Sequence, residues 1–165
     1  MSSRRYEKYL EKEGLIKRCP VDYKAIAKLL TRARIDVRTA KRNLRQDPEC
    51  AYSYAYNAML RTGLGLGLMF SKGFRPDIKG KHLTIVKFAG SILGDEFGKL
   101  VNDYDFMRRK RHRFIYEPGI PCSLKEATHS ITVAEEFVAK VSSLIKTKAP
   151  EIQLKLGDQQ EERPR

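Results

Sequence analysis

The segment IAKLLTRARIDVRTAKRNLRQDPE, residues 26–49, decides the fold class of this chain. Its apolar side chains recur every three or four residues, which is the spacing of one face of an α-helix. They are Ile26, Leu29, Leu30, Ala33, Val37, Ala40 and Leu44. Seven lysines and arginines occupy other positions of the segment. The segment therefore predicts an amphipathic helix with one face in a core.

The end of this segment predicts where the next helix begins. Asp47 is a good N-cap, Pro48 suits the first helical position, and the carboxylate of Glu49 complements the positive end of a helix dipole. We expect the helix to run from Pro48 to about Lys72, because Gly73 offers a left-handed stop.

The next part of the chain keeps the helical spacing after a loop over residues 73–81. Apolar positions between residues 83 and 101 predict one broken helix or two consecutive helices. The break is expected at Gly94, with Asp95 as the cap of the second helix. That helix should continue to about Tyr116, because prolines and a glycine follow it.

The last helix is expected to begin at Ser123, which forms a capping-box pattern with Glu126. No alternating strand pattern of useful length appears, so we predict an all-α fold without a sheet. The economical architecture is an up-and-down antiparallel helical bundle of four to five helices. We assign residues 1–19 to an N-terminal helical extension, 20–149 to the bundle and 150–165 to a polar flexible tail.

Two motifs of the second long helix have both a packing and a ligand-binding interpretation. Gly63, Gly65 and Gly67 alternate with leucines, but no strand precedes them as a dinucleotide fingerprint requires. Tyr52 and Tyr56 share a helix face, where they can either line the core or stack on a base. We favour packing for both motifs.

Composition indicates an anionic partner. The chain has 165 residues, 33 lysines and arginines against 20 acids, and a net charge of +13. Such a charge attracts nucleic acid, anionic membranes or acidic proteins, although many basic proteins are simply soluble cations.

No apolar run approaches the length of a membrane span, and the charged start is unlike a secretory signal. Three scattered cysteines favour a reducing cytoplasm, and no metal or cofactor is expected.

The strongest candidate for a functional site is the segment MRRKRHRFIYE, residues 107–117. Six of its first seven side chains can be positively charged. On a helix Arg108, Arg111 and His112 share one face, and Arg109 and Arg113 share another. Arginine offers planar, bidentate donors to phosphate, and histidine can move a proton near neutral pH. The alternative is a solvated surface neutralised by neighbouring acids.

This segment resembles the Arg-x4–6-His signature of the HEPN (higher eukaryotes and prokaryotes nucleotide-binding) domain family, with Arg111-His112-x-x-x-Tyr116 in its place. The similarity extends in the family's order over four further segments and covers about residues 20–148. These are Asp47–Tyr52 with Tyr56–Arg61, Phe70–Pro76, His82–Val86 and Met107–His112.

The resemblance implies a helical bundle that dimerises and acts as a metal-independent endoribonuclease, often a toxin beside a nucleotidyltransferase-type antitoxin. By that resemblance the catalytic residues are Arg111, which would clamp the scissile phosphate, His112, which would support it, and Tyr116. Tyr116 stands where active members have histidine. A phenol ionises only near about pH 10 and is a poor base at neutral pH.

The remaining cations of the segment are predicted to bind nucleic acid or phosphate. They are Arg108, Arg109, Lys110 and Arg113. The first interpretation is a HEPN-type protein acting on RNA, as a toxin-like ribonuclease or a degenerate relative that binds RNA. The second is a non-catalytic module that binds a nucleotide or a nucleotidyltransferase partner. The third is an assembly protein whose charge only keeps it soluble.

Overall fold

The computed structural model describes residues 3–74, 80–150 and 152. Of the described residues 79% are helical, which confirms the predicted all-α bundle. The helices are α1 (Ser3–Lys12), α2 (Tyr23–Asn43), α3 (Pro48–Met69), α4 (Lys81–Leu93), α5 (Gly98–Tyr116) and α6 (Leu124–Lys148), with a short 3-10 helix η1 (Asp95–Phe97).

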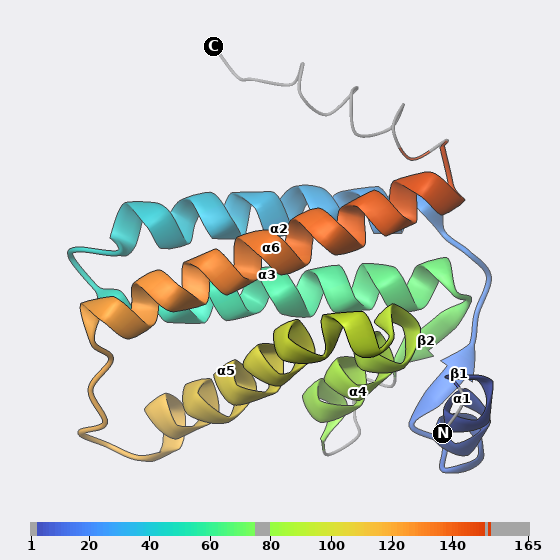
Figure 1. The fold of residues 1–165 in the computed structure, drawn as a ribbon, viewed down its shortest axis with the longest axis horizontal. Coiled ribbons are helices and arrows are strands. Elements are labelled where there is room, and N and C mark those ends of the chain that lie inside the picture. Colours follow the sequence, from blue (N-terminus) through green and yellow to red (C-terminus); the bar gives the residue numbers. More distant parts are fainter. Residues whose placement is uncertain (1–2, 75–79, 151, 153–165) are drawn as a thin grey trace.

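Helix α3 is the centre of the bundle. It packs against α2 and α6 on one side and against α4 and α5 on the other (Figure 1). The four long helices α2, α3, α5 and α6 alternate in direction along the chain, as an up-and-down bundle requires (Figure 1). The predicted stripe of α2 lies in this interior: Ile26, Leu30 and Ala33 are fully buried.

The glycines of α3 allow close contact with its neighbours. A Cβ atom at Gly63 would lie 2.6 Å from Cγ2 of Ile85 in α4, so only glycine fits there without a shift. Gly63, Gly65 and Gly67 are all buried inside the helix. The packing interpretation of the glycine motif is therefore confirmed, and the nucleotide-loop interpretation is wrong. Tyr52 and Tyr56 are also buried on the core face, as expected.

Local capping signals define most helix ends. The Asp47 side chain accepts a hydrogen bond from the Cys50 amide at 2.9 Å, and Pro48 occupies the first turn. Ser123 and Glu126 form the predicted capping box at the start of α6. Asp95 does not cap α5: it begins η1 instead, and Phe97 precedes α5 without a side-chain cap.

The prediction that the chain lacks a sheet is wrong. Strands β1 (Ile16–Arg18) and β2 (Lys72–Phe74) pair antiparallel, with Lys17 opposite Gly73. Gly73 is thus a strand residue, and α3 ends earlier than expected, at Met69. Ser71 takes the positive φ of 58° instead. Three-residue strands are too short to show an alternating pattern, and their pairing joins distant segments.

The N-terminal segment is anchored to the bundle through α4. Leu10 of α1, Ile16 of β1 and Phe88 of α4 form a small second core. Lys72 of β2 also pairs with Glu11 of α1 at 2.5 Å. The segment assigned as a helical extension, residues 1–19, therefore contains a strand as well as a helix.

The predicted polar tail, residues 150–165, lies mostly outside the described residues; Ile152 within it is helical and fully buried.

None of the helices in the described part of the chain has both the length and the apolar character needed to cross a membrane.

Candidate functional site

The predicted site residues line a pocket between α3, the start of α4 and the C-terminal half of α5. We call it the α5 pocket, and its volume is about 520 Å³. Its lining residues are Tyr56, Gly80, Lys81, His82, Leu83, Arg108, Arg111, His112, Ile115 and Tyr116. All three predicted catalytic residues therefore face one cavity, together with one of the four predicted phosphate-binding cations.

Helical spacing brings His112 and Tyr116 together at the open side of the pocket. Their ring centroids are 4.4 Å apart with planes tilted by 40°. Both side chains are exposed; 68% of the Tyr116 surface is accessible. An imidazole and a phenol at this position can each contact a ligand that enters from solvent.

Arg111 is half-buried and lies against the aromatic wall of the pocket. Its guanidinium carbon stands 5.3 Å from the ring centroid of Tyr56, over the face of that ring. Its Nε atom is buried without a hydrogen-bond partner in the described part of the chain. Within that part, Arg111 also has no carboxylate in ion-pair range, so its positive charge is available to an anion in the pocket.

Three other cations of the segment form ion pairs with acids of the same chain. Arg109 pairs with Asp105 at 3.4 Å, and Arg113 pairs with Glu117 at 3.1 Å. Lys110 turns toward α6 and pairs with Glu126 there. None of these three cations lines the α5 pocket.

Arg108 is the fourth predicted phosphate-binding cation. It lines the pocket but also pairs with Asp105 at 2.8 Å. Nearby acids therefore form ion pairs with four of the cations of the segment, whereas Arg111 has none among the described residues.

His82 also lines the pocket, although no sequence pattern predicts it as a site residue. Nδ1 of His82 lies 3.1 Å from the Tyr56 hydroxyl, and that contact orients the imidazole. Burial, followed by the charges of Arg111, Lys81 and Arg108, lowers the pKa of His82. The imidazole is therefore neutral at pH 7 and can accept a proton. Its position next to Arg111 depends on tertiary packing, because His82 lies on α4 and Arg111 on α5.

The start of α4 adds positive potential to the same pocket. Gly80, at the N-cap with φ of 84°, has no side chain that could cap the first turn. No acidic residue occupies that turn, and Lys81 is its first residue. The amide groups at a helix N-terminus attract anions, so α4 reinforces the charge of Arg111.

Tyr56 connects the site to the core. Its ring contacts Tyr104 at a centroid distance of 5.9 Å, and its hydroxyl reaches His82. Burial raises the pKa of Tyr56, although the charge of Arg111 opposes the shift. The phenol therefore stays protonated at neutral pH and serves as a hydrogen-bonding group.

Comparisons with protein-family models, with curated proteins and with solved structures found no match. Among the described residues, no group of three or more histidines, cysteines and acids gathers as metal ligands would. The chemistry of the pocket itself is thus the ground for any functional conclusion.

Proposed function

We propose that the protein binds RNA through a backbone phosphate in the α5 pocket and cleaves it without a metal ion. The observation that supports this proposal is that Arg111, which has no ion-pair partner among the described residues, meets two histidines, His82 and His112, in one cavity. The HEPN resemblance of the Arg111–Tyr116 segment points to the same activity. The negative charge of a phosphodiester would supply the ion-pair partner for Arg111.

The side chains of the α5 pocket can supply both the base and the acid that such a cleavage needs. In this mechanism His82 would carry its proton on Nδ1, toward the Tyr56 hydroxyl, and its Nε2 would take the proton of the ribose 2′-hydroxyl. The 2′-oxygen would then form a bond to phosphorus as the bond to the 5′-oxygen breaks. His112 or Tyr116 would protonate that leaving oxygen. Arg111 and the start of α4 would stabilise the charge on the phosphate oxygens.

A second candidate function is binding of a single nucleotide without cleavage, alone or with a nucleotidyltransferase partner. The neutralised state of Arg109 and Arg113 favours it, because a long RNA track would need more free charge. The pocket volume of about 520 Å³ also lies in the usual range for small ligands. In this case Arg111 would still hold a phosphate, and the histidines would only contact the ligand.

Binding is tested by fluorescence anisotropy with a labelled single-stranded RNA over a range of salt concentrations. Arg111→Gln should weaken binding about tenfold and lower the salt slope by about one ion. Lys28→Gln removes an exposed cation on α2 and is the control; it should bind as the natural chain does. Equal binding by the two variants would remove Arg111 from the site and contradict both candidate functions.

Cleavage is tested with the same RNA in the presence of a metal chelator. His82→Gln should reduce the rate at least a hundredfold while RNA binding stays within about twofold. Tyr116→His restores the residue that the HEPN resemblance expects and should raise the rate. If the natural chain and Tyr116→His both bind tightly and neither cleaves, the protein is a binding module.

A further inference from the structure

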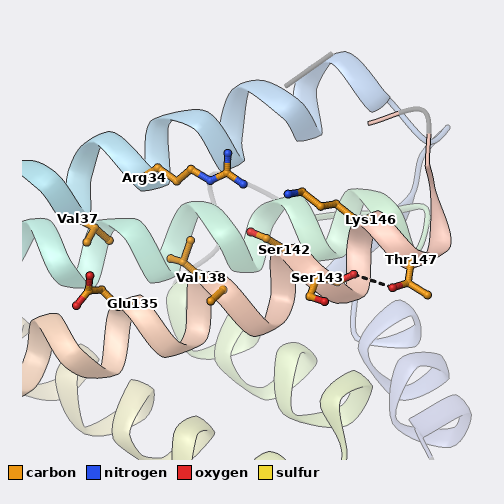
Figure 2. Close-up of a pocket in the computed structure, with 9 residues that line it drawn as sticks. Arg34, Val37, Glu135, Val138, Ser142, Ser143, Lys146 and Thr147 are labelled. Carbon is orange, nitrogen blue, oxygen red and sulfur yellow. Dashed lines mark hydrogen bonds between the residues drawn. The ribbon is translucent and has the colours of Figure 1, made fainter. Parts of the chain in front are cut away.

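A second pocket lies on the opposite side of the bundle, between α2 and α6. Its volume is about 670 Å³, and no residue of the α5 pocket contributes to it. Its lining residues are Arg34, Val37, Glu135, Val138, Ala139, Ser142, Ser143, Lys146 and Thr147. We call it the α2–α6 pocket (Figure 2).

Two cations face each other across this pocket. Figure 2 shows the side chains of Arg34, from α2, and Lys146, from α6, pointing toward one another. In the described part of the chain, neither has a carboxylate within ion-pair distance. The acid of the pocket, Glu135, pairs with Lys41 instead. Two facing cations repel each other, and an anion between them would turn that repulsion into attraction.

A buried hydroxyl lies beside the two cations. Ser142 is only 4% exposed, and its Oγ has no hydrogen-bond partner among the described residues. Buried polar groups are normally paired, so this hydroxyl on the pocket wall is available to donate to a ligand. Further along α6, the Thr147 hydroxyl donates its hydrogen to the Ser143 carbonyl at 3.0 Å, so that hydrogen is not available to a ligand (Figure 2).

The remaining wall is apolar. Val37 of α2 and Val138 of α6 line the pocket beyond the cations (Figure 2). A ligand that suits this arrangement has a doubly charged head between Arg34 and Lys146 and a less polar body on the valines. A phosphate monoester carries a charge of about −1.5 to −2 at neutral pH and several acceptor oxygens. A carboxylate would balance only one of the two cations.

We propose that the α2–α6 pocket binds a small phosphate monoester. Its phosphate lies between Arg34 and Lys146 and accepts a hydrogen bond from the Ser142 hydroxyl. This site is independent of the α5 pocket, because the two share no residue and no helix. The protein therefore has a second place for a phosphorylated small molecule, whatever the α5 pocket does.

The experiment follows backbone amide NMR signals of the natural chain during titration with adenosine 5′-monophosphate, inorganic phosphate or adenosine. The first two should shift signals around Arg34 and Ser142 at millimolar concentration, and adenosine, which lacks phosphate, should not. Shifts confined to residues of the α5 pocket, or no shifts with either phosphate compound, would overturn the proposal.

Variants then assign the contacts. Arg34→Gln and Lys146→Gln should each weaken adenosine 5′-monophosphate binding at the α2–α6 signals about tenfold, as loss of a charge-assisted hydrogen bond does. Ser142→Ala should weaken it by a smaller factor. The matched control, Arg38→Gln, removes an exposed cation one turn further along α2, outside the pocket. Equal affinity in Arg34→Gln and Arg38→Gln would overturn the proposal.

Discussion

Buried glycines show how single residues set the spacing of helices. The Cβ that alanine would add at Gly63 meets Ile85 at 2.6 Å, whereas at Gly65 it meets Leu30 at 3.8 Å, an ordinary contact distance. Both glycines are buried in α3, and both weaken the helix by about 1 kcal/mol relative to alanine. They differ only in the space available beside them.

We therefore expect opposite effects from the same substitution at these two positions. Gly63→Ala should lower the free energy of unfolding by about 1 kcal/mol, since overpacking costs more than the gain in helix propensity. Gly65→Ala should raise it by about 0.5 kcal/mol. Urea denaturation of both variants measures the two values. Stabilisation by Gly63→Ala would mean that α4 is not packed as closely on α3 as the structure has it.

Asp36 is a second residue on which the core depends. It is fully buried in α2 and bonds Nε of Arg32 at 3.1 Å and Nε of Arg61, from α3, at 2.7 Å. It thereby joins the two helices that make the most extensive contact in the bundle.

Asp36→Asn should reduce the free energy of unfolding by about 2 kcal/mol, because two partly exposed arginines lose their common anion. Asp103→Asn is the control, since Asp103 pairs with the largely exposed Lys99 in the preceding turn of α5. That variant should lose less than about 1 kcal/mol. Equal losses in urea denaturation would contradict a special role for Asp36.

The candidate site shows which residue positions a sequence can predict. Arg111, His112 and Tyr116 belong to one helix, so their spacing alone places them together. His82 lies 29 positions before Arg111, on another helix, and no local pattern indicates that it faces the same pocket. Similarly, the sequence shows the charge of Lys110, but its pairing with Glu126 of α6 depends on how the two helices pack.

At the scale of elements, the start of α6 combines a cap with an ion pair. Glu126 accepts from the Ser123 amide at 2.9 Å and also pairs with Lys110 of α5. The hydrogen bond from Lys110, followed by the Ser123 amide, lowers the pKa of Glu126 to about 2. This one carboxylate therefore closes the first turn of α6 and links it to the basic segment of α5.

The lowered pKa predicts a pH dependence of stability. The folded chain binds the Glu126 proton more weakly than the unfolded chain. The stabilisation is therefore present above about pH 4, where unfolded glutamate is ionised. It is lost as the pH falls to about 2. Glu126→Gln should cost about 1 kcal/mol at neutral pH, a value reduced because the side chain is 40% exposed.

The measurement is urea denaturation of the natural chain and Glu126→Gln at several pH values. The difference between them should shrink toward zero near pH 2. Glu136→Gln, which breaks an exposed pair with Lys140, is the control and should change stability little at any pH. A difference for Glu126→Gln that stays constant with pH would show that the carboxylate contributes no charge-dependent stability.

Local sequence predicts the starts of two helices but not the small sheet. Asp47 and Ser123 act within their own turns, and both helices begin where these caps predict. Local sequence does not predict the sheet, because β1 and β2 have only three residues each and pair across more than fifty residues. Ser71 takes the positive φ after α3 because the chain must turn there to enter β2, even though Gly73 suits that conformation better.

For the whole molecule, the distribution of charge and apolar surface on α5 bears on assembly. Ile115 and Tyr116 are large apolar or aromatic residues that remain 57% and 68% exposed beside the α5 pocket. Phe106, also on α5, is 56% exposed. Such side chains can form a contact between two copies, although the net charge of +13 opposes it.

We predict a homodimer in which two α5 helices meet, as the HEPN resemblance implies, and which salt or RNA tightens. Salt screens the repulsion between the two basic chains, and a polyanion neutralises it directly. Light scattering at low and high salt, with and without RNA, gives the mass. Ile115→Ser should shift the population toward monomer because it removes apolar contact. Leu124→Ser, at a 51% exposed leucine on α6, should not. A natural chain that stays monomeric under every one of these conditions would mean that each α5 pocket works alone.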